Sequence, residues 1–284
     1  MSTQPPLKAR AVRFDWSRTP LHWIPGDPYA AHLVNGLHLI APPAERWFIR
    51  VYQEALPLIT DEALKADVRG FMGQEGMHAR AHALVLDQLR THGIDTDAWM
   101  ARFEAVCATL YGETSPIPLP SEGLLWWRLA LVAAGEQMTC VLGDWILETD
   151  GLATAGADAT MMELLRWHGA EEVEHRSVAF DLLKHLAGPM EYPLRVAAMA
   201  TVAPLLVVMW ADGVQDLVAQ DEALQGRPFG VDEFLRLVRA GRSPGWEIPA
   251  AAIRFLDPFF HPAREGSMEK AAAVLATSPG GAVA

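Results

Sequence analysis

The sequence predicts an all-α protein: a four-helix bundle with a two-metal core and additional C-terminal helices. Three observations favour this fold. Apolar residues recur at helical spacing over most of the chain from Ala44 onward. The sequence shows neither the alternating pattern of β-strands nor a Gly-rich phosphate loop. Two Glu-x-x-His pairs, in EGMH (75–78) and EVEH (172–175), lie on predicted helices in the two halves of the chain.

The first half of the chain predicts a wrap and then helices. Residues 1–40 are rich in proline and aromatic side chains, and we expect an ordered wrap there rather than a regular element. The proline pair 42–43 precedes the helical stretch AERWFIRVYQEALPLI, as proline often does at a helix start. A second helix is expected from Thr60, its N-cap, to Gly93, which ends it. A shorter helix covers about 95–111.

The second half repeats the helical pattern. A proline-rich connection at 111–120 leads to a long, very apolar helix that is capped by Ser121 and ended by Gly151. Further helices are expected over about 157–187, 192–221, 231–240 and 247–257. We therefore expect one helical domain over 41–262. An Ala/Gly-rich tail, which we expect to be flexible, covers 263–284.

The most apolar stretch is VAAMATVAPLLVVMWA, residues 196–211. It contains Pro204 and is a little short for a membrane span. We interpret it as a buried helix, with membrane contact as the less favoured alternative.

Composition and charge exclude several classes of function. The 284 residues can bury a sizeable core, and 51% hydrophobic with 20% charged residues is a globular composition. The net charge of −12 disfavours nucleic acid as a partner, because phosphate binding needs a basic surface. Two cysteines do not indicate a disulfide framework, and the N-terminus lacks the apolar core of a signal peptide. We therefore expect a cytoplasmic protein.

The two Glu-x-x-His pairs predict two halves of one metal site. Residues three apart on a helix share a face, so Glu75 with His78, and Glu172 with His175, can each close on one metal ion. A single such pair arises often by chance. Two pairs, each late in a helical hairpin, are much stronger evidence.

Each pair needs a further glutamate at the same height on the preceding antiparallel helix. With the first turn near residue 59, Glu75 and Glu45 are about level at 1.5 Å per residue, whereas Glu54 would lie roughly 16 Å away along the axis. In the second hairpin, Glu136 reaches a height comparable to that of Glu172. Glu136 also lies among apolar residues, where an unpaired carboxylate is costly.

These six residues either form a metal site or are scattered surface acids and histidines. Because the spacing rule is met twice, we favour the site. Four carboxylates and two imidazoles make a hard-to-borderline donor set with open positions. Four carboxylates also balance the charge of two divalent cations.

The roles of the neighbouring residues stay open at this point. His168 shares a helix face with Glu172 and His175, so it is a third histidine ligand, a hydrogen-bond donor to a ligand, or a packed histidine. For His82 we favour a role in supporting a ligand or lining a pocket. Glu171 and Glu174 are expected to be solvated or to support the ligands.

These residues, in this order, resemble a known family. Glu45, QEGMHARAH, Glu136 and WHGAEEVEHRSVAFD are similar to the motifs of the ferritin-like di-iron superfamily. The stretch from about 10 to 220 more closely resembles the bacterial family known as predicted metal-dependent hydrolases. The resemblance implies a ferritin-like bundle with a di-metal core. The family label names a hydrolase, although no nucleophile or water-activating base is evident beyond the metal site.

The helix that carries His168, Glu172 and His175 is also similar to that of the arylamine N-oxygenases. Those are di-iron enzymes with a third histidine ligand, and by this resemblance His168 binds iron. The chain departs from the soluble multicomponent monooxygenases, which carry a threonine one turn after the third glutamate, where this chain has Cys140. Their scheme of proton delivery is therefore not carried over.

We expect a non-haem di-iron oxygenase or oxidase that acts on a hydrophobic small molecule. It would use dioxygen and electrons from an external donor such as ferredoxin or a reductase. The expected cofactor is two iron ions, with manganese or zinc as alternatives, bound by Glu45, Glu75, His78, Glu136, His168, Glu172 and His175. The expected apolar walls are Trp126, Trp127, Phe71, Phe48 and Leu131. A di-metal hydrolase and a non-catalytic metal-binding bundle stay open, as does the oligomeric state, a homodimer included.

Overall fold

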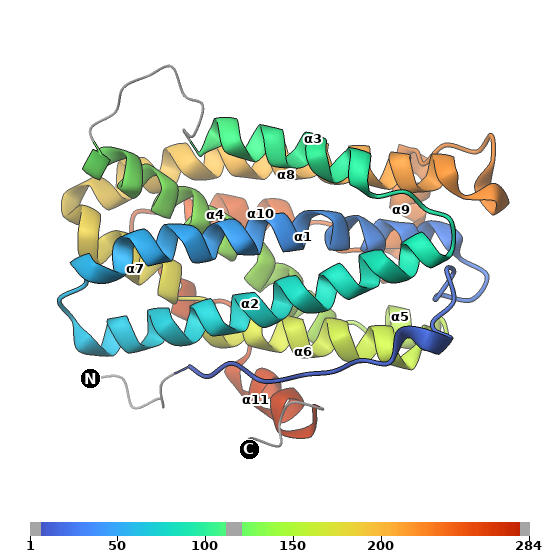
Figure 1. Cartoon of the computed structure of the whole chain (residues 1–284), viewed down its shortest axis with the longest axis horizontal. Coiled ribbons are helices and arrows are strands. Elements are labelled where there is room, and N and C mark those ends of the chain that lie inside the picture. The colour runs from blue at the N-terminus through green and yellow to red at the C-terminus, as the bar shows by residue number, and fades with distance from the viewer. Residues whose placement is uncertain (1–6, 112–120, 279–284) are drawn as a thin grey trace.

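The computed structural model describes residues 7–111 and 121–278, and within these ranges the chain forms helices and no strand (Figure 1). This confirms the all-α prediction. The longer helices are α1 (Pro28–Ala55), α2 (Glu62–Thr91), α4 (Ser121–Glu148), α6 (Ala159–His175) and α8 (Glu191–Gln220). The shorter ones are α3 (Asp97–Leu110), α5 (Gly151–Thr154), α7 (Val178–Ala187), α9 (Val231–Arg239), α10 (Glu247–Phe255) and α11 (Met268–Thr277).

Four of the long helices enclose the centre of the molecule. Helix α1 packs along α2, and α4 packs along α6. The two pairs also touch each other, because α1 contacts α4 and α2 contacts α6. Helix α8 lies against both α1 and α4, and α3 runs beside it (Figure 1). The proline-rich connection predicted between the two halves lies at 112–120, outside the described residues.

Helix α1 corrects the predicted N-terminal wrap. It starts at Pro28, capped by Asp27, and continues through Pro42 and Pro43 instead of beginning after them. An interior proline costs about 3 kcal/mol, because it removes a backbone donor and crowds the preceding turn. Residues ahead of the prolines bury apolar side chains at helical spacing, and each contributes roughly 1.5–3 kcal/mol. Burial thus offsets the two prolines, and the buried side chains include Leu33, Val34 and Leu39.

Two predictions for the second half also need correction. The helix expected over 157–187 is interrupted after His175, and α7 begins at Val178. The tail expected to be flexible contains α11, which packs on α6 and buries Ala271 and Leu275. The two buried apolar side chains lie four residues apart, so they share the side of this amphipathic helix that faces the core.

The apolar stretch 196–211 lies within α8 but is mostly not buried. Its buried side chains are Ala198, Met199, Val202 and Met209, whereas Val207 and Val208 are 51% and 63% exposed. The helical run Ala159–Gln220 holds a window long and apolar enough to cross a membrane, judged by length and composition alone, and 28% of that window is buried. The prediction of a buried helix therefore holds for one side of α8 only.

Candidate metal centre

Four buried glutamates meet between the four central helices. Glu45 comes from α1, Glu75 from α2, Glu136 from α4 and Glu172 from α6. Their exposed fractions are 5%, 1%, 2% and 3%, respectively. By contrast, Glu54 is exposed and forms an ion pair with Arg128 at 3.0 Å, as its predicted distance from the site requires.

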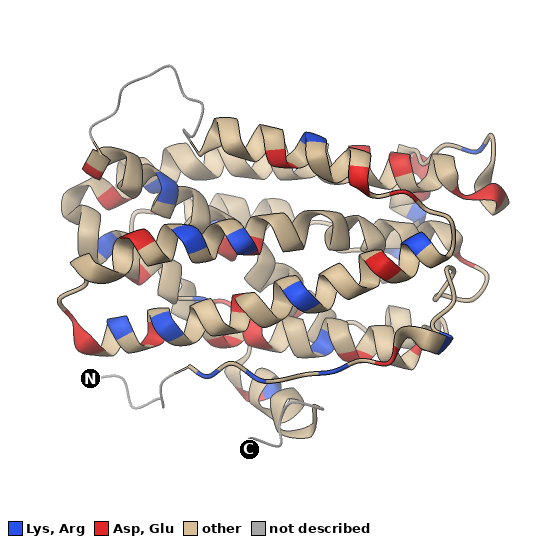
Figure 2. Cartoon of the chain, viewed as in Figure 1, with Lys and Arg blue, Asp and Glu red and all other residues tan. Residues whose placement is uncertain are grey.

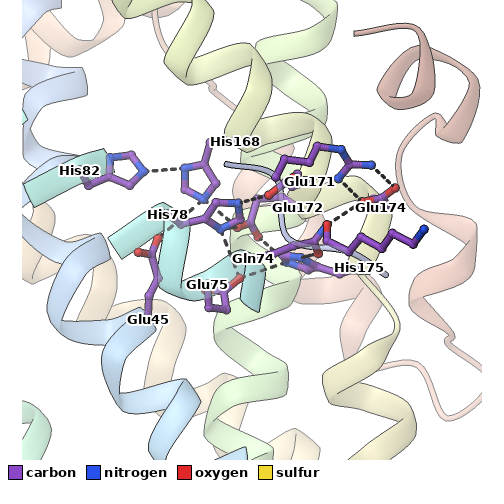
Figure 3. A network of polar contacts seen from close by, with 12 residues as sticks. Glu45, Gln74, Glu75, His78, His82, His168, Glu171, Glu172, Glu174 and His175 are labelled. Atoms are coloured by element: carbon purple, nitrogen blue, oxygen red, sulfur yellow. Dashed lines mark hydrogen bonds and ion pairs between the residues drawn. The ribbon is translucent and has the colours of Figure 1, made fainter. Parts of the chain in front are cut away.

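Both histidines of the Glu-x-x-His pairs face these carboxylates (Figure 3). Nδ1 of His78 lies 3.3 Å from Oε1 of Glu75 and 3.5 Å from Oε1 of Glu172. Nε2 of His175 lies 3.1 Å from Oε2 of Glu136, 3.4 Å from Oε2 of Glu172 and 3.6 Å from Oε1 of Glu75. Overlapping groups of three donor atoms, each group within 4.8 Å, join Glu45, Glu75, His78, His168, Glu172 and His175. The structure thus gathers all seven predicted ligands, and their binding of metal stays a prediction.

The donor atoms fit a metal ion because several of them lack a hydrogen bond. Among the described residues, the buried atoms without a hydrogen-bond partner include Nδ1 of His78, Oε2 of Glu45, both carboxylate oxygens of Glu75 and Oε2 of Glu136. A buried carboxylate oxygen without a donor is costly. Metal ions bound among these atoms would supply the missing partners.

Each of the two paired histidines has its second nitrogen fixed by a partner. Nε2 of His78 lies 2.9 Å from Oε2 of Glu171 and donates to it, so Nδ1 faces the centre, where a metal ion would take the place of its proton. Nδ1 of His175 donates to Oε1 of Gln74 at 3.1 Å, which leaves Nε2 for the centre. Metal-binding histidines are commonly oriented in this way by a carboxylate or an amide.

His168 begins a row of three imidazoles with His82 and His38, and Figure 3 shows the first two of them. Its Nε2 faces Oε1 of Glu172 at 2.7 Å and Oε1 of Glu45 at 3.7 Å. Its Nδ1 lies 2.6 Å from Nε2 of His82, and Nδ1 of His82 lies 2.6 Å from Nδ1 of His38. If Nε2 of His168 binds a metal, Nδ1 donates to His82 and His82 donates to His38. His82 thus contacts His168 as a supporting residue would.

An apolar cavity of about 150 Å³ borders the centre. It lies between α1, α2, α3, α4, α6 and α8, and the four glutamates, His82 and His168 line one part of it. Phe48 and Leu131 line the apolar part as predicted, whereas Phe71, Trp126 and Trp127 lie elsewhere. The Phe71 ring instead packs 4.5 Å from the His175 ring, measured between centroids.

The two residues one turn after Glu136, Thr139 and Cys140, lie in different surroundings. Thr139 lines the cavity, and its hydroxyl donates to the Glu136 carbonyl at 3.2 Å. Cys140 is fully buried in the packed core instead, and burial raises the pKa of its thiol well above the usual range. Cys140 thus stands at the step where the soluble multicomponent monooxygenases carry a threonine, and in this chain it lies in the core.

Residues 8–266 match the family model described as "Predicted metal-dependent hydrolase". The chain belongs to this family. A search of the curated proteins and a search of the solved structures each gave no match.

Membership in the predicted metal-dependent hydrolases and the buried Glu and His groups together indicate a metal cofactor. The family resemblance expected from the motifs is confirmed. The resemblances to the ferritin-like superfamily and to the arylamine N-oxygenases stay predictions, as does the identity of the metal.

In this family member, the centre holds protons that a metal would displace. Burial and the neighbouring Glu75 raise the pKa of Glu45 well above its usual range, and burial with Glu172 raises the pKa of Glu136 to about 8. Burial opposes the charged form of His175, but Glu172 and Glu136 outweigh it and hold its pKa well above 6.5. The pKa of His78 is raised in the same way, chiefly by Glu75 against the effect of burial. Metal binding should therefore release protons.

We expect the metal-free protein to lose stability as the pH rises from about 7 to about 8.5. Over this range the folded state binds more protons at Glu136 than the unfolded chain does, so this group lowers the free energy of unfolding as the pH rises. The buried His38, His82 and His168, whose pKa values burial lowers, act in the opposite direction only at lower pH. His78 and His175 act in the same direction above pH 6.5. Thermal melts in a chelator, with and without added metal, test this. A metal-free melting temperature that increases over this range would contradict it.

A second group of side chains that could bind a metal ion, His22, His32 and Asp221, lies outside this centre. Hydrogen bonds among these residues explain its arrangement better than a metal ion does. His22 and His32 both place Nε2 against Oδ2 of Asp221, at 2.6 and 2.9 Å. The indole N–H of Trp23 donates to Oδ1 of Asn35 at 2.9 Å, so the Asn35 amide group turns its N–H toward Nδ1 of His32 at 3.5 Å. Nδ1 of His32 is then an acceptor, and its Nε2 donates to Asp221. We interpret the group as an anchor for the end of α8.

Three residues of this region were missed from the sequence. Gln74, His38 and Arg10 contact the candidate ligands or their partners from segments distant in sequence, so helical spacing carries no signal for them. Glu171 was expected to be solvated or to support a ligand, and it is fully buried against His78.

Proposed function

We propose that this protein is a ferritin-like di-iron oxidoreductase that oxidises a hydrophobic small molecule with dioxygen. One observation carries the proposal: four carboxylates and three imidazoles from four helices converge beside an apolar cavity. Storage of metal does not require such a cavity, whereas a reaction on an apolar substrate does.

The seven predicted ligands would hold two metal ions in this proposal. Iron bound there would supply oxygen and redox chemistry. The four carboxylates would balance the charge of two divalent cations. His78 and His175 are already turned with one nitrogen toward the centre. The apolar lining, with Phe48 and Leu131, would exclude water and hold an apolar substrate next to Glu45 and Glu136.

The remaining partners belong to the same proposal. The sequence contains no flavin or nicotinamide motif, so electrons would come from a separate donor such as ferredoxin or a reductase. We also propose a cytoplasmic location, where such donors are found, and we do not propose nucleic acid as a partner. A homodimer and membrane contact through α8 are secondary proposals.

A di-metal hydrolase is the second candidate, favoured by the description of the family. In such an enzyme the metal ions activate water, and zinc or manganese can serve without electrons or oxygen.

Oxygen dependence separates the two candidates. The protein is loaded anaerobically with iron or with zinc, and the metal content per chain is measured. The proposal expects about two irons per chain and consumption of oxygen by the reduced iron form. The zinc form serves as the control and should consume none. Anaerobic turnover of an ester or amide panel by the zinc form, with an oxygen-inert iron form, would establish the hydrolase instead.

The cavity should bind a small apolar molecule independently of the metal. A cavity of about 150 Å³ is large enough to hold benzene. We expect Ala41→Phe, which fills the cavity from α1, to weaken benzene binding at least about tenfold, a change of about 1.4 kcal/mol, while the metal content stays unchanged. Calorimetry or NMR measures this. Ala197→Phe, on the exposed side of α8, is the matched control. Equal benzene binding by both variants would place the substrate elsewhere.

A further inference from the structure

We propose that Arg10 is a positioning residue that sets the orientation of both histidines of the Glu-x-x-His pairs. It acts from the N-terminal strap, residues 7–14, through Glu171 and Glu174 on α6. This role rests on the proposed metal centre, but it is independent of whether the reaction is an oxidation or a hydrolysis.

The strap runs in extended form along α2 and α6, and basic residues follow it past the acidic positions of these helices (Figures 1 and 2). Its backbone is pressed against α2 at a glycine. A Cβ atom at Gly70 would lie 2.2 Å from the Leu7 carbonyl oxygen, so only glycine permits this approach. One turn along α2, Gln74 donates to the Lys8 carbonyl at 3.2 Å. These contacts hold the strap against α2 at Leu7 and Lys8, just before Arg10.

Arg10 reaches His78 through Glu171. Nη1 of Arg10 lies 2.7 Å from Oε1 of Glu171, whose side chain is fully buried, and the second oxygen of Glu171 accepts from Nε2 of His78. Because Oε2 of Glu171 accepts from Nε2 of His78, Nδ1 on the other side of the ring is turned toward the metal centre.

Arg10 reaches His175 through a longer path, of which Figure 3 labels Glu174, Gln74 and His175. Its guanidinium binds both oxygens of Glu174, at 2.7 and 2.9 Å. Oε2 of Glu174 accepts from Nε2 of Gln74 at 2.7 Å, which orients the amide so that its oxygen faces His175. That oxygen accepts the proton of Nδ1 and leaves Nε2 for the metal.

One planar guanidinium therefore serves two carboxylates with different tasks. Its donors form a rigid fork, so it can pair with Glu174 through two bonds and with Glu171 through a third. A lysine ammonium carries equal charge but lacks this fork. Without Arg10, the buried Glu171 loses its cation, and both histidine partners can turn away from their rings.

The test measures Co²⁺ as a probe of the site. We expect Arg10→Gln to weaken Co²⁺ binding by about 10- to 100-fold and to change the visible absorption of the bound cobalt. Arg13→Gln removes the same charge from an exposed position of the same strap and should change neither. Arg10→Lys should restore only part of the affinity. Glu171→Gln should make a further Arg10→Gln change less harmful, because the two residues act in series.

Each outcome decides the role of Arg10. Cobalt affinity and spectrum of Arg10→Gln equal to those of the wild type overturn it, even though the metal centre itself would stand. A wild-type protein that binds no cobalt, iron, manganese or zinc overturns the metal centre, and this role with it. If Arg10→Gln fails to fold, Glu174→Gln replaces it. Glu174 is partly exposed, so this change isolates the His175 path, and an unchanged cobalt spectrum would contradict the proposal.

Discussion

Glu136→Ala is expected to abolish binding of at least one of the two metal ions. Glu136 is the carboxylate that α4 brings to the centre, it is 2% exposed, and its Oε2 has no hydrogen bond among the described residues. Loss of a residue that merely supports a ligand weakens metal binding about 10- to 100-fold, so loss of a ligand should exceed this range. Metal analysis after dialysis, and titration with iron or cobalt, measure the effect.

Glu54→Ala provides the control for this experiment. Glu54 lies on α1, like Glu45, but it is exposed and paired with Arg128, so the metal content should not change. A Glu136→Ala protein that still holds two metals per chain would show that our ligand set is wrong.

A second variant at this position separates binding from folding. Glu136→Gln keeps the size of the side chain and removes its charge. Because burial and Glu172 raise the pKa of Glu136 to about 8, the neutral amide should stabilise the metal-free protein at alkaline pH while it weakens metal binding. Opposite signs of the two effects would indicate that the centre is organised for metal at the expense of the metal-free fold.

Gly143→Leu is expected to separate α4 from α6 and to disturb the centre between them. A Cβ atom at Gly143 would lie 2.6 Å from the Gly169 carbonyl oxygen and 3.1 Å from Cβ of Glu172. Backbone atoms cannot move aside as a side chain end can, so the two helices must move apart. We expect the free energy of unfolding to fall by about 1–3 kcal/mol. We also expect weaker metal binding, because the movement of the helices shifts Glu172.

Gly123→Leu is the matched control for this change. Gly123 lies on the same helix, and a Cβ atom there would meet nothing within 4 Å. Leucine is a better helix former than glycine by up to about 1 kcal/mol, so this variant should be as stable as the wild type or more stable. Chemical denaturation of both variants, with metal content, measures the difference. Wild-type stability in Gly143→Leu would contradict the tight approach of the two helices.

The arrangement of the candidate ligands could be predicted because it depends on regular helical geometry. Three-residue spacing places Glu75 beside His78 and Glu172 beside His175, and the rise per residue separates Glu45 from Glu54. These relations are local to one helix or one hairpin. They hold regardless of how the rest of the chain packs.

Other features depend on contacts between distant segments, and the sequence does not reveal them. Nothing near Arg10 indicates that it pairs with Glu171 and Glu174 across more than 160 positions. The start of α1 was misplaced because Pro42 and Pro43 resemble a helix start, while the burial that overrides them depends on tertiary packing. The outer side of α8 was misjudged for a related reason, since hydropathy does not tell which neighbours cover a helix.

The origin of the four glutamates has a consequence for the mechanics of the protein. Glu45 and Glu75 belong to one helical pair, and Glu136 and Glu172 to the other. Metal bound by all four glutamates would crosslink the α1–α2 pair to the α4–α6 pair, and removal of the metal would undo this crosslink. Hydrogen exchange should then slow in α1, α2, α4 and α6 together when metal is added, while α9, which contributes no ligand, should keep its exchange rate.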